Sequence, residues 1–444
     1  MHQRYNDLSA DLCWDSAFSF FDGKWSRTDV LAFAEEISGV PREEIWRDRL
    51  NNNDQTAKIE VLENVSKYLL DLAEDIISGK SRDDVLPVKT ESRYDNMSRK
   101  YRTIASLSIP HQLLGHLVKL GLQPLFDAYI LPTQHASMPG RGQTRLVRQV
   151  AKYLRSDKLG IRYYQKTDVI NAYGSIMYDR VYRTISELIP RAKWILALLK
   201  YIGGFAPDGH LIIGGYLDAW LFNFMMSFAL RFALNQGYYR RGKFIPYIVR
   251  IVTYMDDFDL LSRSKKGLIE IVPLMDEYMR RHLGVSIRKT TGIIRLLDRE
   301  EEIRRRSLPK PAQRGCPGID MAGYDIRRTH IVLRKRVAKR MIRTFSRAYT
   351  ELNRTGTISL KRARSVTSRW GALKQTNSYK FCKKYHVHQI LAKAKGVVRI
   401  HDRQENLRKK EWMRNAVRKY TERCYAEHGK RRSNGQACQA GRSC

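Results

Sequence analysis

Two sets of acidic residues in this chain stand where carboxylates can do chemistry. Asp256 and Asp257 lie between two apolar, β-branched and aromatic runs, and Asp168 ends another such run far upstream. Strands from different parts of a chain can bring such acids together at the rim of a sheet. Carboxylate oxygens are the ligands that Mg²⁺ prefers, and two such ions can activate a hydroxyl and stabilise a leaving pyrophosphate. Taken alone, the Asp-Asp pair has an alternative interpretation as a surface β-turn, where Asp is common.

The segments around these acids predict a body of mixed helices and strands. Runs rich in Ile, Val, Tyr and Phe predict strands over residues 161–170, 246–254 and 258–262. Helical stretches near residues 176–201 and 216–235 separate the first two strands. This order predicts an α+β body and excludes a doubly wound βαβ sheet.

Further helices are predicted on the N-terminal side of this body. Apolar residues recur every three or four positions from Ile59 to Ile76, which predicts an amphipathic helix. Residues 80–95 are polar and predict a linker. Two more helical stretches are predicted around residues 108–128 and 141–155.

The charge of the chain points to a polyanionic partner. Lys and Arg number 81 against 45 Asp and Glu, a formal net charge of +36. Residues 1–90 carry 11 basic and 18 acidic residues, whereas residues 331–444 carry 31 basic and 6 acidic residues. Nucleic acid is therefore the first partner to consider, and a membrane surface the weaker alternative. In the helix predicted after residue 332, the side chains that we expect to contact phosphates are Arg334, Arg336, Lys339, Arg340 and Arg343.

Two further features bear on location. The longest apolar stretch, from Ala219 to Leu230, is too short to span a bilayer, so no membrane partner is expected. The six cysteines are scattered without paired spacing, which favours a reducing cytoplasm.

Residues 429–444 lack apolar periodicity and are predicted to be disordered.

Several ordered motifs together resemble those of reverse transcriptases. TYMDDF (253–258) resembles the YxDD signature of that family, and DVINAYGS (168–175) resembles its first catalytic motif. The other similar segments are a fingers motif at 137–143, a second palm motif at 214–224, a lysine-bearing segment at 287–293 and a primer-grip hairpin at 318–336.

The resemblance implies an α+β, right-hand polymerase fold with fingers, palm and a helical basic thumb, preceded by a helical N-terminal module. The domain plan that it implies is an acidic helical module at 1–90, fingers at 91–160, palm at 161–315, primer grip and basic helical thumb at 316–428, and a disordered tail at 429–444.

The resemblance also implies roles for individual residues. Tyr173 corresponds to the aromatic residue that excludes a 2′-hydroxyl, so deoxynucleotides are the expected substrates. Lys289 corresponds to a lysine near the phosphates of the incoming nucleotide, and Arg141, flanked by Gly140 and Gly142, suits a loop that faces these phosphates. The residues that correspond to the ligands of two Mg²⁺ ions are Asp168, Val169, Asp256 and Asp257.

One position departs from the family pattern. The Ser-Gln pair of the second palm motif is replaced here by Asp218 and Ala219. Two interpretations stay open: drift at a tolerant position, or a carboxylate that accepts a hydrogen bond from the incoming base and helps to select it.

The expected activity is RNA-directed DNA synthesis with dNTPs as substrates and DNA as the product. The acidic N-terminal module and the altered palm motif resemble the unknown-group, defence-associated reverse transcriptases of bacteria. Such enzymes work with a dedicated noncoding RNA, as oligomers or with a partner protein, in anti-phage defence. The alternatives are a diversity-generating retroelement enzyme, untemplated or protein-guided synthesis of repetitive DNA, and a non-catalytic RNA-binding scaffold.

Overall fold

The chain divides into two compact units, each described here by itself. The computed structural model describes residues 7–50, 55–80, 82–85, 87–95, 100–289, 291–307 and 318–440. The first unit is built mainly from residues 85–397, and the second combines residues 8–84 with the chain from residue 398 onward.

An antiparallel sheet lies at the centre of the first unit. Its strand order is β6-β7-β3-β8, and β9 also pairs with β3. The strands are β3 (Tyr163–Val169), β6 (Arg250–Tyr254), β7 (Asp257–Ser262), β8 (Ile287–Lys289) and β9 (Ile294–Arg295). Strands β3, β6 and β7 carry the β-branched and aromatic residues that favour strands, and the inner positions of all three are buried.

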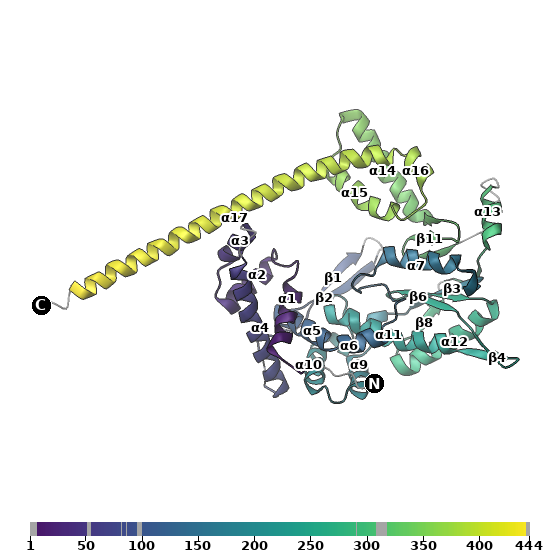
Figure 1. The fold of residues 1–444 in the computed structure, drawn as a ribbon, viewed down its shortest axis with the longest axis horizontal. Helices are drawn as coiled ribbons and strands as arrows, with labels where there is room; N and C mark the ends of the chain where they lie inside the picture. Colours follow the sequence, from purple (N-terminus) through teal and green to yellow (C-terminus); the bar gives the residue numbers. More distant parts are fainter. Residues whose placement is uncertain are drawn as a thin grey trace. The chain divides into compact units, whose positions relative to one another are not determined.

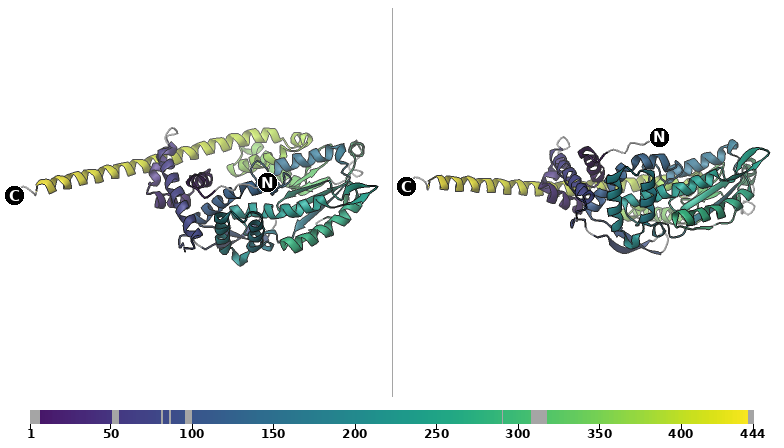
Figure 2. Two further views of the ribbon diagram at one scale, coloured as in Figure 1. Left: turned by 60° about the horizontal axis from the view of Figure 1, so that its bottom comes forward. Right: turned by 90° about the horizontal axis from the view of Figure 1, so that it is seen from below.

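Helices α11 (Tyr216–Asn235) and α12 (Lys265–Leu283) cover the sheet on its lower side in Figure 1. Figure 2 shows helices of this unit running along the strands. Helix α11 is apolar almost all round and is long and apolar enough to cross a membrane. However, 72% of its most apolar 18-residue stretch is buried inside the protein. It is longer than the apolar stretch seen in the sequence because the helix continues through Arg231 to Asn235.

Smaller elements surround this core. The helices are α5 (Ile109–Gly121), α6 (Gln123–Tyr129), α7 (Gln143–Arg155), α8 (Ala172–Ser175), α9 (Tyr178–Leu188), α10 (Lys193–Gly204) and α13 (Arg299–Ser307), with 3₁₀ turns at Asp157–Leu159 and Pro207–Gly209. Two separate hairpins are formed by β1 (Lys89–Asp95) with β2 (Lys100–Ser106) and by β4 (Gly237–Arg240) with β5 (Lys243–Pro246).

A second small sheet and a group of helices complete the first unit. The sheet consists of β10 (Ile319–Met321), β11 (Tyr324–Ile326) and β12 (Ile331–Leu333). The helices are α14 (Lys335–Thr355), α15 (Leu360–Leu373), α16 (Tyr379–Lys384) and the start of α17 (Val387–Ala440). Met341, Phe345, Ala348 and Leu352 are the buried residues of α14, and their spacing of three and four positions places them on one face of the helix.

The second unit is helical. It contains α1 (Ala10–Phe21), α2 (Thr28–Ser38), α3 (Arg42–Leu50), α4 (Thr56–Ile77) and the part of α17 from residue 398 onward. Helix α4 buries Val61, Val65, Leu69 and Leu72 against its neighbours, which confirms the predicted amphipathic helix.

The predicted α+β class is confirmed, together with a helical N-terminal region and a helical, basic C-terminal region. Two segments differ from expectation. Residues 80–95 were expected to be a linker, but residues 89–95 form strand β1. The chain was expected to be disordered from residue 429, but α17 continues to Ala440; the expectation rested on missing apolar periodicity, which a helix that is polar all round also lacks. Residues 441–444 lie outside the described residues.

Candidate catalytic site

Strands β3 and β7 place two of the predicted acids side by side. Asp168 lies directly opposite Asp257 in the antiparallel register, so both carboxylates stand on the same face of the sheet. Met255 and Asp256 form the two-residue turn between β6 and β7, and Met255 has a φ of 55°. A positive φ is what tight hairpin turns of this length require. The backbone N–H of Val169 donates to the carbonyl of Asp256 at 3.0 Å, which fixes this turn against the end of β3.

Each carboxylate of the opposed pair has a cationic partner. Arg288 in β8 donates to Asp168 over 2.7 Å, and Lys166 in β3 donates to Asp257 over 2.8 Å. The Asp168 and Asp257 side chains are 18% and 35% exposed, so both can be reached from solvent. Two accessible carboxylates that already attract cations form a donor set that fits a hard divalent ion such as Mg²⁺.

A further acid on the same face is fully buried. Asp259 follows Asp257 by two positions in β7 and is 0% exposed. Within the described part of the chain, neither of its carboxylate oxygens has a hydrogen-bond partner. Burial raises the pKa of Asp259 to about 8, while the charge of Lys166 opposes this increase.

Tyr173 lies between the Met255–Asp256 turn and helix α11. Its ring stacks on Phe222 with centroids 4.9 Å apart, and its hydroxyl lies 3.7 Å from the sulfur of Met255. Burial raises the pKa of Tyr173, with smaller contributions from the charges of Asp218 and Asp256. The structure therefore brings the predicted sugar-selecting residue to the turn that carries Asp256.

Asp218 is buried near the start of α11. Its Oδ1 accepts hydrogen bonds from the Tyr178 hydroxyl and the Ile212 backbone N–H, each at 3.0 Å. A side chain at Gly215 would collide with Asp218, because an added Cβ would lie 1.8 Å from its Oδ2. Burial raises the pKa of Asp218 to about 6. The structure thus gives Asp218 partners inside the protein, and contact with a base stays a prediction.

The two predicted phosphate-side residues lie in different settings. Arg141 donates from one guanidinium nitrogen to the carbonyls of Leu131 and Gln134, at 2.7 and 2.9 Å, and burial lowers its pKa. It therefore braces the loop that precedes α7. Lys289 lies in β8, opposite Thr167 of β3. The contacts of these two residues with phosphate stay predictions.

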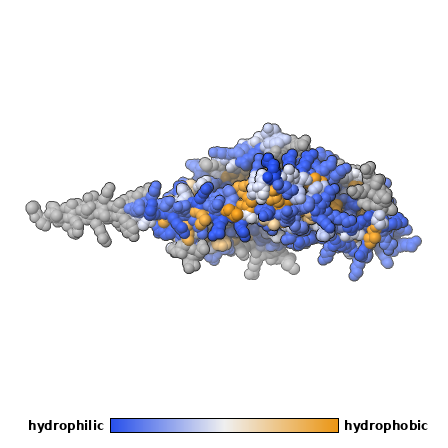
Figure 3. Space-filling model, turned by 90° about the horizontal axis from the view of Figure 1, so that it is seen from above, coloured by the Kyte–Doolittle hydropathy of each residue, from blue (hydrophilic) through white to orange (hydrophobic). Residues whose placement is uncertain are grey.

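The basic face predicted after residue 332 lies on α14. Arg334 is at its N-cap and pairs with Asp320 of β10, so its charge is already engaged within the protein. Arg336, Lys339 and Arg343 are exposed, and none of them has an acidic partner among the described residues; Arg340 is half-buried. The side of the molecule drawn in Figure 3 is mostly hydrophilic, with smaller hydrophobic patches.

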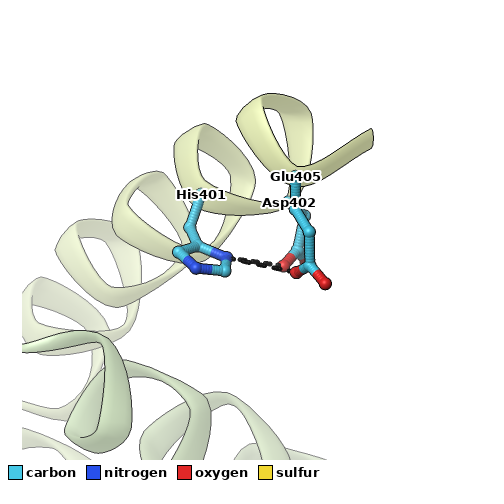
Figure 4. A group of neighbouring side chains, drawn as sticks. All are labelled: His401, Asp402 and Glu405. Carbon is cyan, nitrogen blue, oxygen red and sulfur yellow. Dashed lines mark ion pairs between the residues drawn. The ribbon is translucent and has the colours of Figure 1, made fainter. Parts of the chain in front are cut away.

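One other group of potential metal ligands belongs to the second unit. His401, Asp402 and Glu405 lie within reach of one another on a single helix, α17 (Figure 4). The imidazole Nδ1 lies 3.6 Å from a carboxylate oxygen of each acid. All three side chains are half-exposed, and His401 and Glu405 are four positions apart, a spacing at which helix side chains are neighbours.

Sequence reasoning missed three residues of the site, namely Lys166, Arg288 and Asp259. A signal was present for two of them: Lys166 and Asp259 are charged residues inside apolar strands. Arg288 gave no such signal, since its pairing with Asp168 depends on β8 lying next to β3.

Comparison with known proteins identifies no family. No protein-family model and no curated protein matches the sequence. A Sicinivirus RNA-dependent RNA polymerase aligns with a TM-score of 0.32 and 14% identity, over 50% of this chain and 49% of that one. Telomerase from Candida albicans, solved with a fragment of telomeric RNA, aligns with a TM-score of 0.37 and 11% identity, over 74% of this chain and 64% of that one. The chain thus spans about half of the viral polymerase and under two thirds of the telomerase.

Proposed function

We propose that the chain is a reverse transcriptase, an RNA-directed DNA polymerase that joins dNTPs by Mg²⁺-dependent nucleotidyl transfer. The observation that carries this proposal is the pairing of Asp168 with Asp257 on adjacent strands, with Asp256 in the adjoining turn. Three acids at the rim of one sheet suit a site that holds divalent cations and the phosphates bound to them.

The roles in this proposal are assigned to the chain's own groups. Asp168, Asp256 and Asp257, with the backbone carbonyl of Val169, would hold two Mg²⁺ ions. Bound there, the ions would activate the 3′-hydroxyl of the primer and stabilise the leaving pyrophosphate. Tyr173 limits the space beside the sugar, which favours deoxynucleotides.

The biological setting belongs to the same proposal. A net charge of +36 and the exposed cations of α14 support a nucleic-acid template and product. We propose a dedicated noncoding RNA as the template and anti-phage defence in the bacterial cytoplasm as the role, with a second copy or another protein as partner.

Primer extension with Mg²⁺ and dNTPs tests the activity. Asp256→Asn should keep the fold and reduce synthesis roughly 100-fold or more, because a neutral amide cannot replace a carboxylate that holds the cation. Asp402→Asn, in the half-exposed cluster on α17, is the control and should retain wild-type synthesis.

The products separate the proposal from its alternatives. A cDNA complementary to an added or co-purified RNA supports templated synthesis. Repetitive DNA unrelated to that RNA supports untemplated synthesis instead. Near wild-type primer extension by Asp256→Asn would overturn the assignment of the catalytic site. Wild-type protein that binds RNA without DNA synthesis would support a non-catalytic scaffold.

A further inference from the structure

The face of the central sheet that carries Asp168 and Asp257 also contains a buried carboxyl group that the proposed reaction does not use. Asp259 is fully buried, and neither of its oxygens has a hydrogen-bond partner in the described part of the chain. Buried carboxyl groups, charged or neutral, are rarely left without a hydrogen-bond partner, because burial removes their hydration. The burial of Asp259 therefore calls for an explanation, and the residues around it provide one.

The residue directly opposite Asp259 is Lys166. Its side chain is 11% exposed, and its ammonium group donates to the catalytic Asp257 over 2.8 Å. Alternation along β7 puts Asp257 and Asp259 on the same face, about 7 Å apart along the strand. Lys166 thus stands across from one carboxylate while it contacts the other. A lysine has a flexible four-carbon stem and three donors, so one residue can serve either acceptor.

The other charges near Asp259 do not compete for this role. Besides Lys166 and Asp257, the groups that act on it electrostatically are Asp320 and Arg334. These two form an ion pair with each other where β10 meets α14. Nearby, the hydroxyl of Tyr164 in β3 donates a hydrogen bond to the carbonyl of Gly318, which directly precedes β10.

We propose that Lys166 is a positioning residue shared by the two acids, and that Asp259 accepts its ammonium group when a divalent cation occupies Asp257. This rests on the proposed function insofar as Asp257 is a metal ligand. The reason is competition: an ammonium and a divalent cation both need the oxygens of Asp257. Binding of the ion would therefore displace Lys166 from Asp257, and Asp259, directly opposite Lys166, offers an acceptor for its ammonium group. The effect of Asp259 on metal binding is thus exerted through Lys166.

Metal binding to the full chain tests the proposal without any need for synthesis. Mn²⁺ is the probe, its free fraction is measured by electron paramagnetic resonance, and melting temperature is recorded for every variant. Asp259→Asn should weaken the Asp257-dependent Mn²⁺ affinity roughly tenfold, because Lys166 then stays on Asp257. Adding Lys166→Met to that variant should restore an affinity at or above that of the wild type. Lys166→Arg, which keeps the charge, should bind Mn²⁺ more tightly than Asp259→Asn does.

A structural role alone would give a different pattern. Lys166→Met by itself leaves Asp259 buried without its cation and should lower the melting temperature, whereas Lys166→Met with Asp259→Leu should recover it. Asp48→Asn, a buried acid of the second unit, is the control and should leave Mn²⁺ affinity unchanged. Wild-type Mn²⁺ affinity in Asp259→Asn, or a further loss when Lys166→Met is added, would overturn the proposal.

The same titration distinguishes failure of the proposal from failure of the proposed function. If Asp257→Asn binds Mn²⁺ as the wild type does, the metal site itself is wrong and both are overturned. If Asp257→Asn loses the ion while Asp259→Asn keeps wild-type affinity, only the role of Lys166 and Asp259 is overturned.

Discussion

Tyr173 is held by two contacts, and each can be changed separately. Tyr173→Ala removes the ring that stacks on Phe222 and opens space beside the sugar, so ribonucleotide incorporation relative to deoxyribonucleotide should rise roughly tenfold or more, equivalent to about 1.4 kcal/mol. Tyr173→Phe keeps the ring, loses only the contact with Met255, and should keep wild-type selectivity. Single-nucleotide incorporation with matched rNTP and dNTP pools measures both. An unchanged ratio in the alanine variant would contradict the sugar-selecting role.

Asp218 predicts a pH dependence of stability. Burial raises its pKa to about 6 in the folded protein from a reference value of 3.8, so the folded state holds this proton more tightly than the unfolded state. The resulting stabilisation is fully present below about pH 4 and is lost as pH rises toward 6 and beyond; a shift of about two units corresponds to about 3 kcal/mol.

Asp218→Asn should abolish this dependence while its amide oxygen still accepts from Tyr178 and Ile212. The free energy of unfolding, measured by urea titration from pH 4 to 7, should therefore rise for the variant relative to the wild type as pH increases. Asp179→Asn, at an exposed position on α9, is the control. Parallel pH profiles for wild type and Asp218→Asn would show that Asp218 is not buried as described.

Among single residues, the acids of the site could be predicted because the pattern that marks them lies within a few neighbouring residues of the sequence. Asp168, Asp256 and Asp257 each end or join an apolar strand, and that pattern is visible in the sequence. The partners Lys166 and Arg288 could not be assigned from sequence, because their contacts depend on which strands are neighbours and in what register. Asp218 illustrates the same limit, since burial and its two donors come from segments that only the fold brings together.

At the scale of elements, α14 carries a prediction about nucleic-acid binding. Lys339 and Arg343 lie four positions apart on its exposed face, and neither has an acidic partner among the residues that the structure describes. Lys339→Gln with Arg343→Gln should reduce the slope of log affinity against log salt by about 1.4 to 1.8, because each phosphate contact contributes about 0.7 to 0.9.

The matched control for this pair is Lys265→Gln with Lys266→Gln, which removes the same charge from the exposed start of α12. Fluorescence anisotropy of a labelled RNA–DNA duplex across a salt series gives both slopes. Equal slopes for the two double variants would mean that the α14 face is only solvated and that the nucleic acid binds elsewhere.

The buried elements follow from the sequence better than the exposed ones. Helix α4 has an apolar face with the period of a helix, whereas the segments of β3, β6, β7 and α11 are rich in apolar, β-branched and aromatic residues; both signals are visible in the sequence, so these positions were predicted. Hairpin β1–β2 was missed because its strands, KTESRYD and KYRTIAS, are polar on both faces. No apolar alternation marks strands of this kind.

At the scale of the whole molecule, the N-terminal helices do not stand alone. The ring of Trp46 in α3 packs against Trp412 in α17 with centroids 4.7 Å apart, and the hydroxyl of Tyr420 donates to Glu44 at 2.9 Å. The second unit is therefore assembled from both ends of the sequence, which the linear domain plan did not anticipate.

Trp412→Ala should loosen this unit. Aromatic pairs of this kind contribute about 1 kcal/mol, so the amides of α3 should exchange with solvent roughly fivefold faster. Leu407→Ala, an equally exposed position on the same helix, is the control and should leave exchange unchanged. Hydrogen–deuterium exchange measured by mass spectrometry on the full chain reports both. Unchanged exchange in α3 after Trp412→Ala would mean that the packing contributes nothing.

The pairing of Asp168 with Asp257 also constrains how this chain can change over generations. Successive side chains of a strand point to opposite faces, so a substitution beside either acid leaves both in place. Gain or loss of one codon within β3 or β7 instead turns every later side chain in that strand to the wrong face. We therefore expect insertions and deletions to be tolerated in the connections, such as the helical segment between β3 and β6, and within the two strands only substitutions.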